Sequence, residues 1–474
     1  MVVQHNMQAA NANRMLNVTT GQQAKSTEKL SSGYRINRAA DDAAGLTISE
    51  KMRKQIKGLD RASTNAEDGV SAVQTAEGAL TEVHSMLQRM NELATQSANG
   101  TNSNTDRKAI QDEIDQLTTE IDRVSETTKF NETYLLKGDG AEKAHNVNAH
   151  DAGLDGVTLT DKGDEVDVTL KTLNAGDKVS IAGKNYTIGG EEADVTKLLT
   201  DAGVTDTENA KVTINGTEYT YYTKTADGKN NLNKPGFFAT APDKADATAK
   251  YENVAAIAKL KSSTITAGGK SVTTMGNVTD GVDDKDSSVI TEKKAYMLER
   301  AEIVKASSIG TDEVAKTTDN ATVANATNTF TLTKGKVNYN DALSFNLHVG
   351  ADADMTNKIT VNIDSMNSAG LGVKGIKADT EQDATYAIDA IADAISTVSS
   401  QRSALGAVQN RLEHTINNLD NVVENTTSAE SRIRDTDMAE EMVNYSKNNI
   451  LAQAGQSMLA QANQSNQGVL SLLQ

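Results

Sequence analysis

The chain has 474 residues, no Cys or Trp, and a formal net charge of −18 at pH 7. The excess of acidic residues argues against nucleic-acid binding, because a surface that binds phosphates needs more Lys and Arg than Asp and Glu. The lack of Cys excludes disulfides, thiolate nucleophiles and zinc–cysteine sites, and no apolar run approaches the roughly 18 residues that predict membrane insertion as a helix.

Both ends of the chain are nearly free of charge. Residues 1–24 contain one charged side chain, Arg14, and residues 442–474 contain one, Lys447, whereas 24% of the whole chain is charged. Such segments suit burial against copies of the same chain. Because helices with sparse apolar positions are marginal in water, we expect both ends to be disordered in the monomer and to fold on assembly. The expected assembly residues are Met7, Met15, Met442, Ile450, Leu451, Met458, Leu459 and Leu470.

A heptad repeat predicts a long helix from about residue 46 to residue 97. Apolar and small residues recur at two positions of each heptad, which is typical of a coiled coil. Asn99 and Gly100 end the repeat. A second apolar stripe from Ile110 to Val124 predicts another helix, which ends near residues 129–131. The larger seam residues of the first helix are Leu59, Val73, Leu80, Val83 and Leu87.

Residues 141–337 have a different composition, dominated by Thr, Asp, Gly, Lys and Val. Alternation of apolar and polar residues predicts half-buried strands at 157–160, 166–170 and 212–222, separated by Gly-containing turns. A short helix is expected near 290–305. Further strands are predicted at 330–333, 343–349 and 359–363, so one or two β-rich domains are inserted between helical arms.

A second long heptad repeat follows the β-rich region, with seam residues Val398, Leu405, Leu412 and Leu419. Its stripe needs a partner. Pairing with the N-terminal helices within the same chain is favoured, and two coiled coils that each dimerise with another molecule are the alternative. The predicted fold class is α+β, with a long antiparallel coiled-coil helical bundle formed by both chain ends and inserted β-rich outer domains.

The sequence contains no recognisable catalytic or cofactor-binding motif. His84 and His414 lie near helical stripes, where surface or seam positions explain them better than ligand roles. The acidic segment 280–286 lacks the spacing and the bidentate Glu of an EF-hand, so a solvated turn is favoured over a calcium site. We therefore predict a non-enzymatic protein without cofactor, metal or catalytic residues.

Several long segments carry a family resemblance. Residues 30–46 (LSSGYRINRAADDAAGL), 87–99 and 120–125 resemble the N-terminal signature of bacterial flagellin, and residues 428–443 and 450–463 resemble its C-terminal signature. The resemblance covers roughly residues 1–138 and 338–474, while the middle matches nothing recognisable, as is usual for the variable outer region of that family.

The resemblance implies a helical homopolymer, the flagellar filament used for motility. A subunit contact that repeats without closing generates such an open helix. The implied organisation is an N-terminal inner-tube helix and connecting spoke (1–43), N-terminal outer-tube helices (44–140), variable β-rich outer domains (141–337), a C-terminal outer-tube β-hairpin and long helix (338–430), and a C-terminal inner-tube helix (431–474).

The resemblance also implies a location and partners. The first residues do not form a secretory signal peptide, which agrees with export by the flagellar type III route without cleavage, to an extracellular flagellum. Implied partners are other copies of the chain, a flagellar export chaperone, the filament cap and hook–filament junction proteins. No nucleic acid or membrane insertion is expected.

A second implied partner is the animal innate receptor Toll-like receptor 5. The positions that match the family's receptor-binding surface are Gln88, Arg89, Leu93 and Glu113, with Arg89 as a charged contact and Leu93 as an apolar one. The sequence departs from many recognised flagellins at Met90 and Asn91, where those proteins have Val and Arg. Alternatively, Arg89 and Glu113 serve filament packing.

Two other functions are compatible with the same features. A hook–filament junction protein has similar ends, although the segment 87–99 and the final residues match the filament protein more closely. An enzymatic insert in the variable region is the other, and no catalytic constellation supports it.

Overall fold

The computed structural model describes residues 6–318, 322, 323 and 325–471, and the side chains of these residues up to 464. It divides into two compact units. Unit 1 comprises Met1–Gln74, Phe345–Val361 and Leu405–Gln474, and unit 2 comprises Thr75–Ser344 and Asn362–Ala404. The two longest helices, α2 (Ala43–Ser97) and α7 (Glu381–Arg434), contribute to both units.

In unit 1, α2 and α7 pair in antiparallel fashion. The Ser63 hydroxyl donates to Asp420 at 3.1 Å, and Arg53 pairs with Glu430 at 3.5 Å, so increasing residue numbers on one helix meet decreasing numbers on the other. The predicted intramolecular bundle is confirmed, and the alternative of two separate intermolecular coiled coils is wrong. Within the seam, Leu59 is half-buried and the other predicted positions are buried: Val73, Leu80, Val83, Leu87, Val398, Leu405, Leu412 and Leu419.

A β-hairpin packs on this helix pair. The strands β19 (Leu343–His348) and β20 (Lys358–Ile363) pair with each other, and a short 3-10 helix η1 (Met355–Asn357) lies in their connection. Val349 and Ile359 of the hairpin region form a core cluster with Ala66 of α2 and Leu412 of α7. The hairpin therefore completes the apolar core of unit 1.

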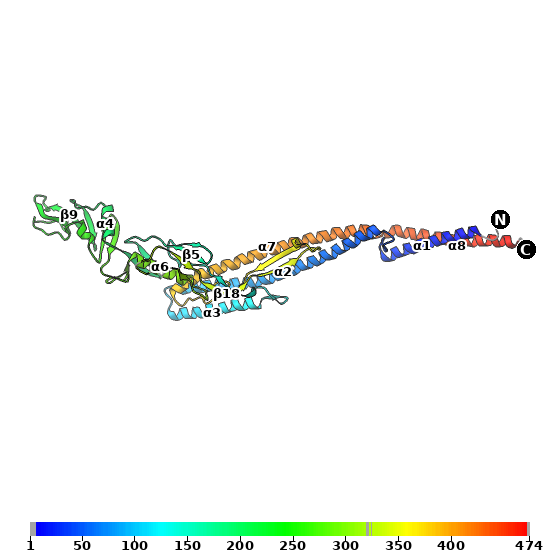
Figure 1. The fold of residues 1–474 in the computed structure, drawn as a ribbon, viewed down its shortest axis with the longest axis horizontal. Helices are drawn as coiled ribbons and strands as arrows, with labels where there is room; N and C mark the ends of the chain where they lie inside the picture. The colour runs from blue at the N-terminus through cyan, green and yellow to red at the C-terminus, as the bar shows by residue number, and fades with distance from the viewer. Residues whose placement is uncertain (1–5, 319–321, 324, 472–474) are drawn as a thin grey trace. The chain divides into compact units, whose positions relative to one another are not determined.

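The second helix pair of unit 1 is α1 (Met7–Ser32) and α8 (Met438–Ser471), which lie side by side in Figure 1. The Asn6 side chain caps α1 by accepting from Ala9 N and also donates to Ala462 O at 3.1 Å, whereas Lys29 pairs with Glu441 at 3.6 Å. These contacts make the pair antiparallel. The expectation that both ends are disordered in the single chain is wrong, because each helix covers one side of the other.

The start of α3 (Asn104–Thr127) in unit 2 follows from its first residues. Ser103 and Asp106 form a capping box that satisfies free backbone N–H groups at the start of that helix. The other helices of unit 2 are α4 (Glu192–Asp201), α5 (Val254–Ala258) and α6 (Glu292–Ala306).

The strands of unit 2 form several sheets. Two-stranded pairs are β1 (Lys129–Phe130) with β2 (Thr133–Tyr134), and β3 (Asp139–Asn146) with β18 (Lys336–Asp341). A four-stranded sheet has the order β16 (Lys316–Thr317), β17 (Thr329–Thr333), β5 (Glu165–Thr169) and β4 (Thr158–Asp161).

The largest sheet has ten strands. Its order is β10 (Asn231–Phe238), β9 (Thr217–Lys224), β8 (Lys211–Ile214), β11 (Ser263–Ala267), β12 (Lys270–Thr274), β7 (Lys184–Gly190), β15 (Val289–Ile290), β14 (Val282–Asp283) and β13 (Val278–Thr279), with β6 (Lys178–Ile181) also pairing with β7.

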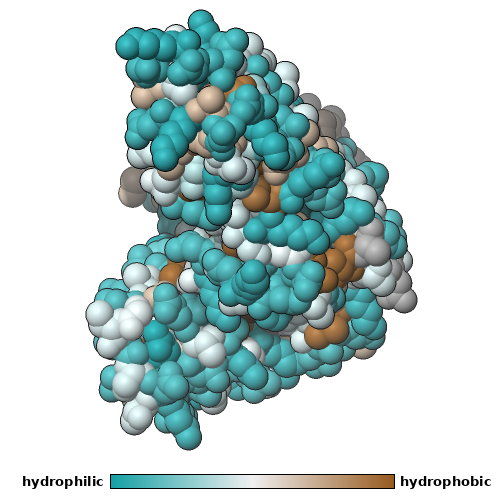
Figure 2. Space-filling model, turned by 90° about the vertical axis from the view of Figure 1, so that its left-hand side faces the viewer, coloured by the Kyte–Doolittle hydropathy of each residue, from teal (hydrophilic) through white to brown (hydrophobic). Residues whose placement is uncertain are grey.

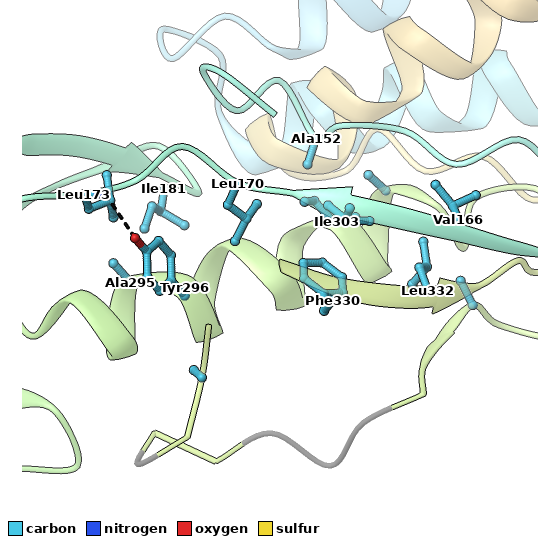
Figure 3. Packing of buried hydrophobic residues seen from close by; sticks show 14 of the residues in the cluster. Ala152, Val166, Leu170, Leu173, Ile181, Ala295, Tyr296, Ile303, Phe330 and Leu332 are labelled. Atoms are coloured by element: carbon cyan, nitrogen blue, oxygen red, sulfur yellow. Dashed lines mark hydrogen bonds between the residues drawn. The ribbon is translucent and has the colours of Figure 1, made fainter. Parts of the chain in front are cut away.

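Two apolar cores support these sheets. In the first, drawn in Figure 3, Ile303 of α6 lies beside Phe330 of β17. Tyr296 of α6 lies near Leu173 and Ile181, and its hydroxyl accepts a hydrogen bond from Leu173 N at 3.0 Å. The second core gathers residues of α4, β8, β9 and β11 around the fully buried Phe237.

Most predicted strands and the short helix of the middle region are confirmed. The segment 212–222 is a hairpin rather than one strand, because Asn215 and Gly216 have φ values of 47° and 80°, which suit a tight two-residue turn. The structure adds α4 and α5, which the sequence analysis missed.

Candidate functional site

The terminal helices expose most of their large apolar side chains. The exposed fractions are 66% for Met7, 63% for Met15, 63% for Met442, 66% for Ile450, 47% for Leu451 and 61% for Met458. We call these six residues the terminal surface. Of the other two predicted assembly residues, Leu459 is half-buried, and the side chain of Leu470 lies outside the described residues.

All the side chains of the terminal surface except Met7 line one of two shallow hollows. One hollow is lined by Met442, Ile450 and Leu451 of α8 together with Val443 and the stem of Lys447. The other lies between the two helices. It is lined by Gln8, Asn11, Ala12 and Met15 of α1 and by Gly455, Met458, Gln461 and Ala462 of α8. By contrast, the face shown in Figure 2 is mainly hydrophilic, with small separated hydrophobic areas.

The fully buried part of the contact between α1 and α8 consists of small and polar side chains, with the half-buried Leu16 of α1 beside Gly455 of α8. Its buried residues are Ser26 of α1 and Ala452 and Glu441 of α8. Small side chains let two helices approach closely but remove little apolar area from water. The pair therefore leaves its larger apolar side chains available for another molecule.

The connection between the helix pairs of unit 1 is held by a cluster around Tyr34. The guanidinium of Arg434 lies over the Tyr34 ring at 4.7 Å and pairs with Glu50 at 2.8 Å. Arg35 donates to the backbone oxygen of Ile433 at 2.6 Å. Sequence analysis missed this cluster, although Tyr34, Arg35 and Arg434 lie inside the flagellin-like segments.

A second candidate surface lies on α2 and α3 in unit 2. The Nε of Arg89 donates to Glu113 at 2.9 Å, and its Nη1 donates to Glu92 at 3.2 Å. Both carboxylates raise the pKa of Arg89, chiefly through the hydrogen bond that Arg89 donates to Glu113. Gln88 bonds to His84 at 3.1 Å. We call Gln88, Arg89, Glu92 and Glu113 the α2–α3 surface.

Leu93 occupies a different position from the other residues of this set. Its side chain is 2% exposed, so it supports the α2–α3 surface from below and is not open to a receptor in this conformation. The structure therefore brings Gln88, Arg89 and Glu113 together at the surface and places Leu93 in the core.

Arg107 is a positioning residue that sequence analysis missed. Its side chain is buried and donates to the backbone oxygens of Ser97, Asn102 and Asn99 at 2.9, 3.0 and 3.1 Å. These bonds join the end of α2 to the start of α3 and so set how Arg89 meets Glu113. Arg107 lies in the first turn of α3, just before the apolar stripe that marked this helix in the sequence, so no pattern signalled its role.

The acidic segment 280–286 is not simply a solvated turn. Asp283 is 5% exposed and accepts hydrogen bonds from the backbone N–H groups of Gly276, Lys285 and Asp286. Burial opposes ionisation, but these donors outweigh it and lower the pKa of Asp283. The carboxylate therefore organises the loop from inside.

The described residues contain no cluster of three or more His, Asp or Glu side chains arranged to hold a metal ion. None of the described helices combines the length and apolar character needed to span a bilayer. His84 bonds to Gln88, and His414 is exposed on α7.

Comparisons with known proteins give consistent matches. Residues 3–141 match the model of the bacterial flagellin N-terminal helical region, and residues 388–473 match that of the C-terminal helical region. The chain is 39% identical to a flagellin of Clostridium tyrobutyricum over 98% of this chain and 100% of that protein. It is 34% identical to flagellin C of Vibrio cholerae over 99% of each, and 33% identical to a flagellin of Halalkalibacterium halodurans over 100% of each.

Proposed function

The chain belongs to the bacterial flagellin family, and we propose that its terminal surface joins it to other copies and that its α2–α3 surface binds Toll-like receptor 5. As a flagellin it is a structural, non-enzymatic subunit of the flagellar filament, and it serves motility. Flagellins match it along nearly its whole length, which favours the filament protein over the junction protein.

The exposure of the terminal surface carries the assembly proposal. Met442, Ile450 and Met458 are each more than half exposed on one helix, with fractions of 63%, 66% and 61%. Burying large apolar side chains contributes about 25 cal/mol per Å² of apolar area removed from water. Neighbouring copies that cover these residues gain this free energy, whereas the α1–α8 contact alone does not.

The first test is electron microscopy of the full-length chain beside a deletion of residues 442–474. We expect filaments from the first and none from the second. Filaments from both chains would overturn the assignment of assembly to this end.

Point substitutions provide a sharper version of this test, because a deletion also leaves α1 without its partner. The triple variant Met442→Ser, Ile450→Ser, Met458→Ser is expected to abolish seeded growth. The control is Val422→Ser, which alters another exposed apolar side chain, 40% exposed on α7, and is expected to leave growth unchanged.

The Arg89 cluster carries the receptor proposal. The guanidinium is 50% exposed in its pair with Glu113, which is 45% exposed, so both ions are open to a partner while held in fixed positions. Preorganised, charge-assisted donors of this kind are frequent binding hot spots. Leu93 contributes by supporting α2 rather than by direct contact.

Arg89→Ala is expected to weaken binding of the monomer to Toll-like receptor 5 by about 1–3 kcal/mol, as for a typical hot-spot residue. The matched control is Arg123→Ala on α3, which removes an Arg 60% exposed in a similar surface pair with Glu120. A titration in which Arg89→Ala and Arg123→Ala bind equally well would contradict the proposal.

The family membership also supports finer proposals on domains, export and partners. The inner tube is formed by residues 1–43 and 431–474, with the connecting spoke also in 1–43. The outer tube is formed by residues 44–140 and 338–430, and the variable outer domains by residues 141–337. The chain leaves the cell by the flagellar type III route, with an export chaperone on its C-terminal segment. Filament cap and hook–filament junction proteins contact it at the filament ends.

A further inference from the structure

The exposed methionines of the described residues are concentrated on the terminal helices. Met7, Met15, Met438, Met442 and Met458 are 66%, 63%, 51%, 63% and 61% exposed, and we call them the terminal methionines. The remaining methionine that is exposed to a similar degree within the described ranges is Met355, at 74%, on the connection between β19 and β20.

Two methionines in the core are far less accessible than the terminal methionines. Met90 of α2 and Met366 are 0% exposed. Oxidation of a thioether requires that the oxidant reach the sulfur, so a soluble oxidant reaches the terminal methionines and Met355 before the core methionines.

Three of the terminal methionines lie where a polar atom would interfere with assembly. Met15 of α1 and Met458 of α8 line the same hollow, beside Gly455. Met442 lines the other hollow with Ile450 and Leu451. A sulfoxide oxygen at any of these sulfurs would place a strong hydrogen-bond acceptor within an apolar patch.

We propose that the terminal methionines are sites of reversible oxidation by peroxides, and that their oxidation blocks filament assembly of the monomer. The proposal rests on the proposed role of the terminal surface in assembly. In the step itself, a peroxide transfers one oxygen atom to the thioether sulfur while the O–O bond breaks. The sulfur is oxidised by two electrons, and the peroxide is reduced, to water from hydrogen peroxide or to an alcohol from an alkyl hydroperoxide.

The effect follows from the cost of burying the new oxygen. A buried polar group without a hydrogen-bond partner is strongly unfavourable, and sulfoxide formation disrupts Met-rich interfaces. Each sulfoxide left without a partner in a subunit contact is expected to weaken association roughly tenfold. Assembly covers the same sulfurs, so filaments are expected to oxidise more slowly at these positions than monomers do.

The test uses the full-length chain treated with hydrogen peroxide and then returned to assembly with filament seeds. Peptide mass spectrometry measures sulfoxide at each methionine, and sedimentation measures the critical concentration. We expect a rise of at least about tenfold in critical concentration, with sulfoxide at the terminal methionines. Untreated chain run in parallel must assemble, which separates failure of this proposal from failure of the proposed function.

Two variants test which methionines cause the loss of assembly after oxidation. The variant with Leu at all five terminal methionines is expected to assemble after peroxide treatment, whereas Met355→Leu is expected to stay as sensitive as the unaltered chain. Normal assembly of the oxidised chain, or equal sensitivity of the five-Leu variant, would overturn the proposal.

A reversal experiment covers the case in which the five-Leu variant does not assemble even without peroxide. Methionine sulfoxide reductases of both stereospecificities return the sulfoxide to the thioether. Treatment of the oxidised, unaltered chain with both enzymes is expected to restore the critical concentration. Removal of the sulfoxides without recovery of assembly would contradict the proposal.

Discussion

The two antiparallel helix pairs of this chain bury different kinds of side chain. Between α2 and α7, the seam holds large apolar residues such as Leu80 and Leu412, each 0% exposed. Between α1 and α8, the buried positions are Ser26, Ala452 and Glu441, while most of the large apolar residues are exposed. The first pair completes its core within one chain. The second pair buries few side chains within one chain and leaves most of its large apolar residues open to other molecules.

The largest expected effect on stability comes from comparing one substitution in each helix pair. Leu412→Ala removes a buried side chain that packs with Ala66, Val349 and Ile359, and it is expected to lower the free energy of unfolding by about 2–5 kcal/mol. Met458→Ala shortens a side chain that is 61% exposed, so a change within about 0.5 kcal/mol is expected.

Urea unfolding of the two monomeric variants, followed by circular dichroism, measures both free energies. Met458→Ala is expected to impair filament growth despite its small effect on the monomer. Equal destabilisation by the two substitutions would mean that α1 and α8 have a core of their own, and the comparison would fail.

Sequence alone predicted much of this contrast. A heptad period predicts where a helix needs a partner, and the seam residues Val73 and Leu405 are buried as expected. The scarcity of charge at the ends correctly marked them as unusual. It did not predict that they are helical within one chain, because the small residues that allow α1 and α8 to meet have no periodic signal of their own.

The candidate surfaces were only partly predictable. The family resemblance pointed to Arg89 and Glu113, and the structure joins them at 2.9 Å. They did not show that Leu93 is buried, since burial depends on the partner helices. The role of Arg107 depends on where a turn folds back, and the pairing of β3 with β18 joins residues as distant as Asn146 and Lys336. Neither feature leaves a local pattern.

Two glycines on α2 test how tightly the β19–β20 hairpin packs against this helix. A Cβ at Gly69 would lie well inside contact distance of the Leu347 side chain, whereas a Cβ at Gly78 meets nothing within 4 Å. We expect Gly69→Ala to cost about 1–3 kcal/mol through overpacking. Gly78→Ala is expected to stabilise the chain by up to about 1 kcal/mol through helix propensity.

Thermal or urea unfolding of the two glycine variants provides the measurement. Because both substitutions add one methyl group to the same helix, their difference isolates the contact with the β19–β20 hairpin. Stabilisation by Gly69→Ala equal to that of Gly78→Ala would show that the hairpin yields freely, and the packed core of unit 1 would need revision.

The smallest expected effect concerns the ion pair between α1 and α8. Lys29 and Glu441 lie 3.6 Å apart, with side chains 31% and 11% exposed. Glu441→Gln keeps the shape of the side chain and removes its charge. Partly exposed pairs of this kind contribute roughly 0–1 kcal/mol, so we expect a loss of stability in that range that shrinks as salt is added.

The measurement is urea unfolding of the variant and the unaltered chain at low and high salt. A salt-independent loss above about 2 kcal/mol would be typical of a buried pair. Such a loss would mean that the α1–α8 contact within one chain contributes substantial stability. We expect instead that α1 and α8 are stabilised mainly by contacts with other copies.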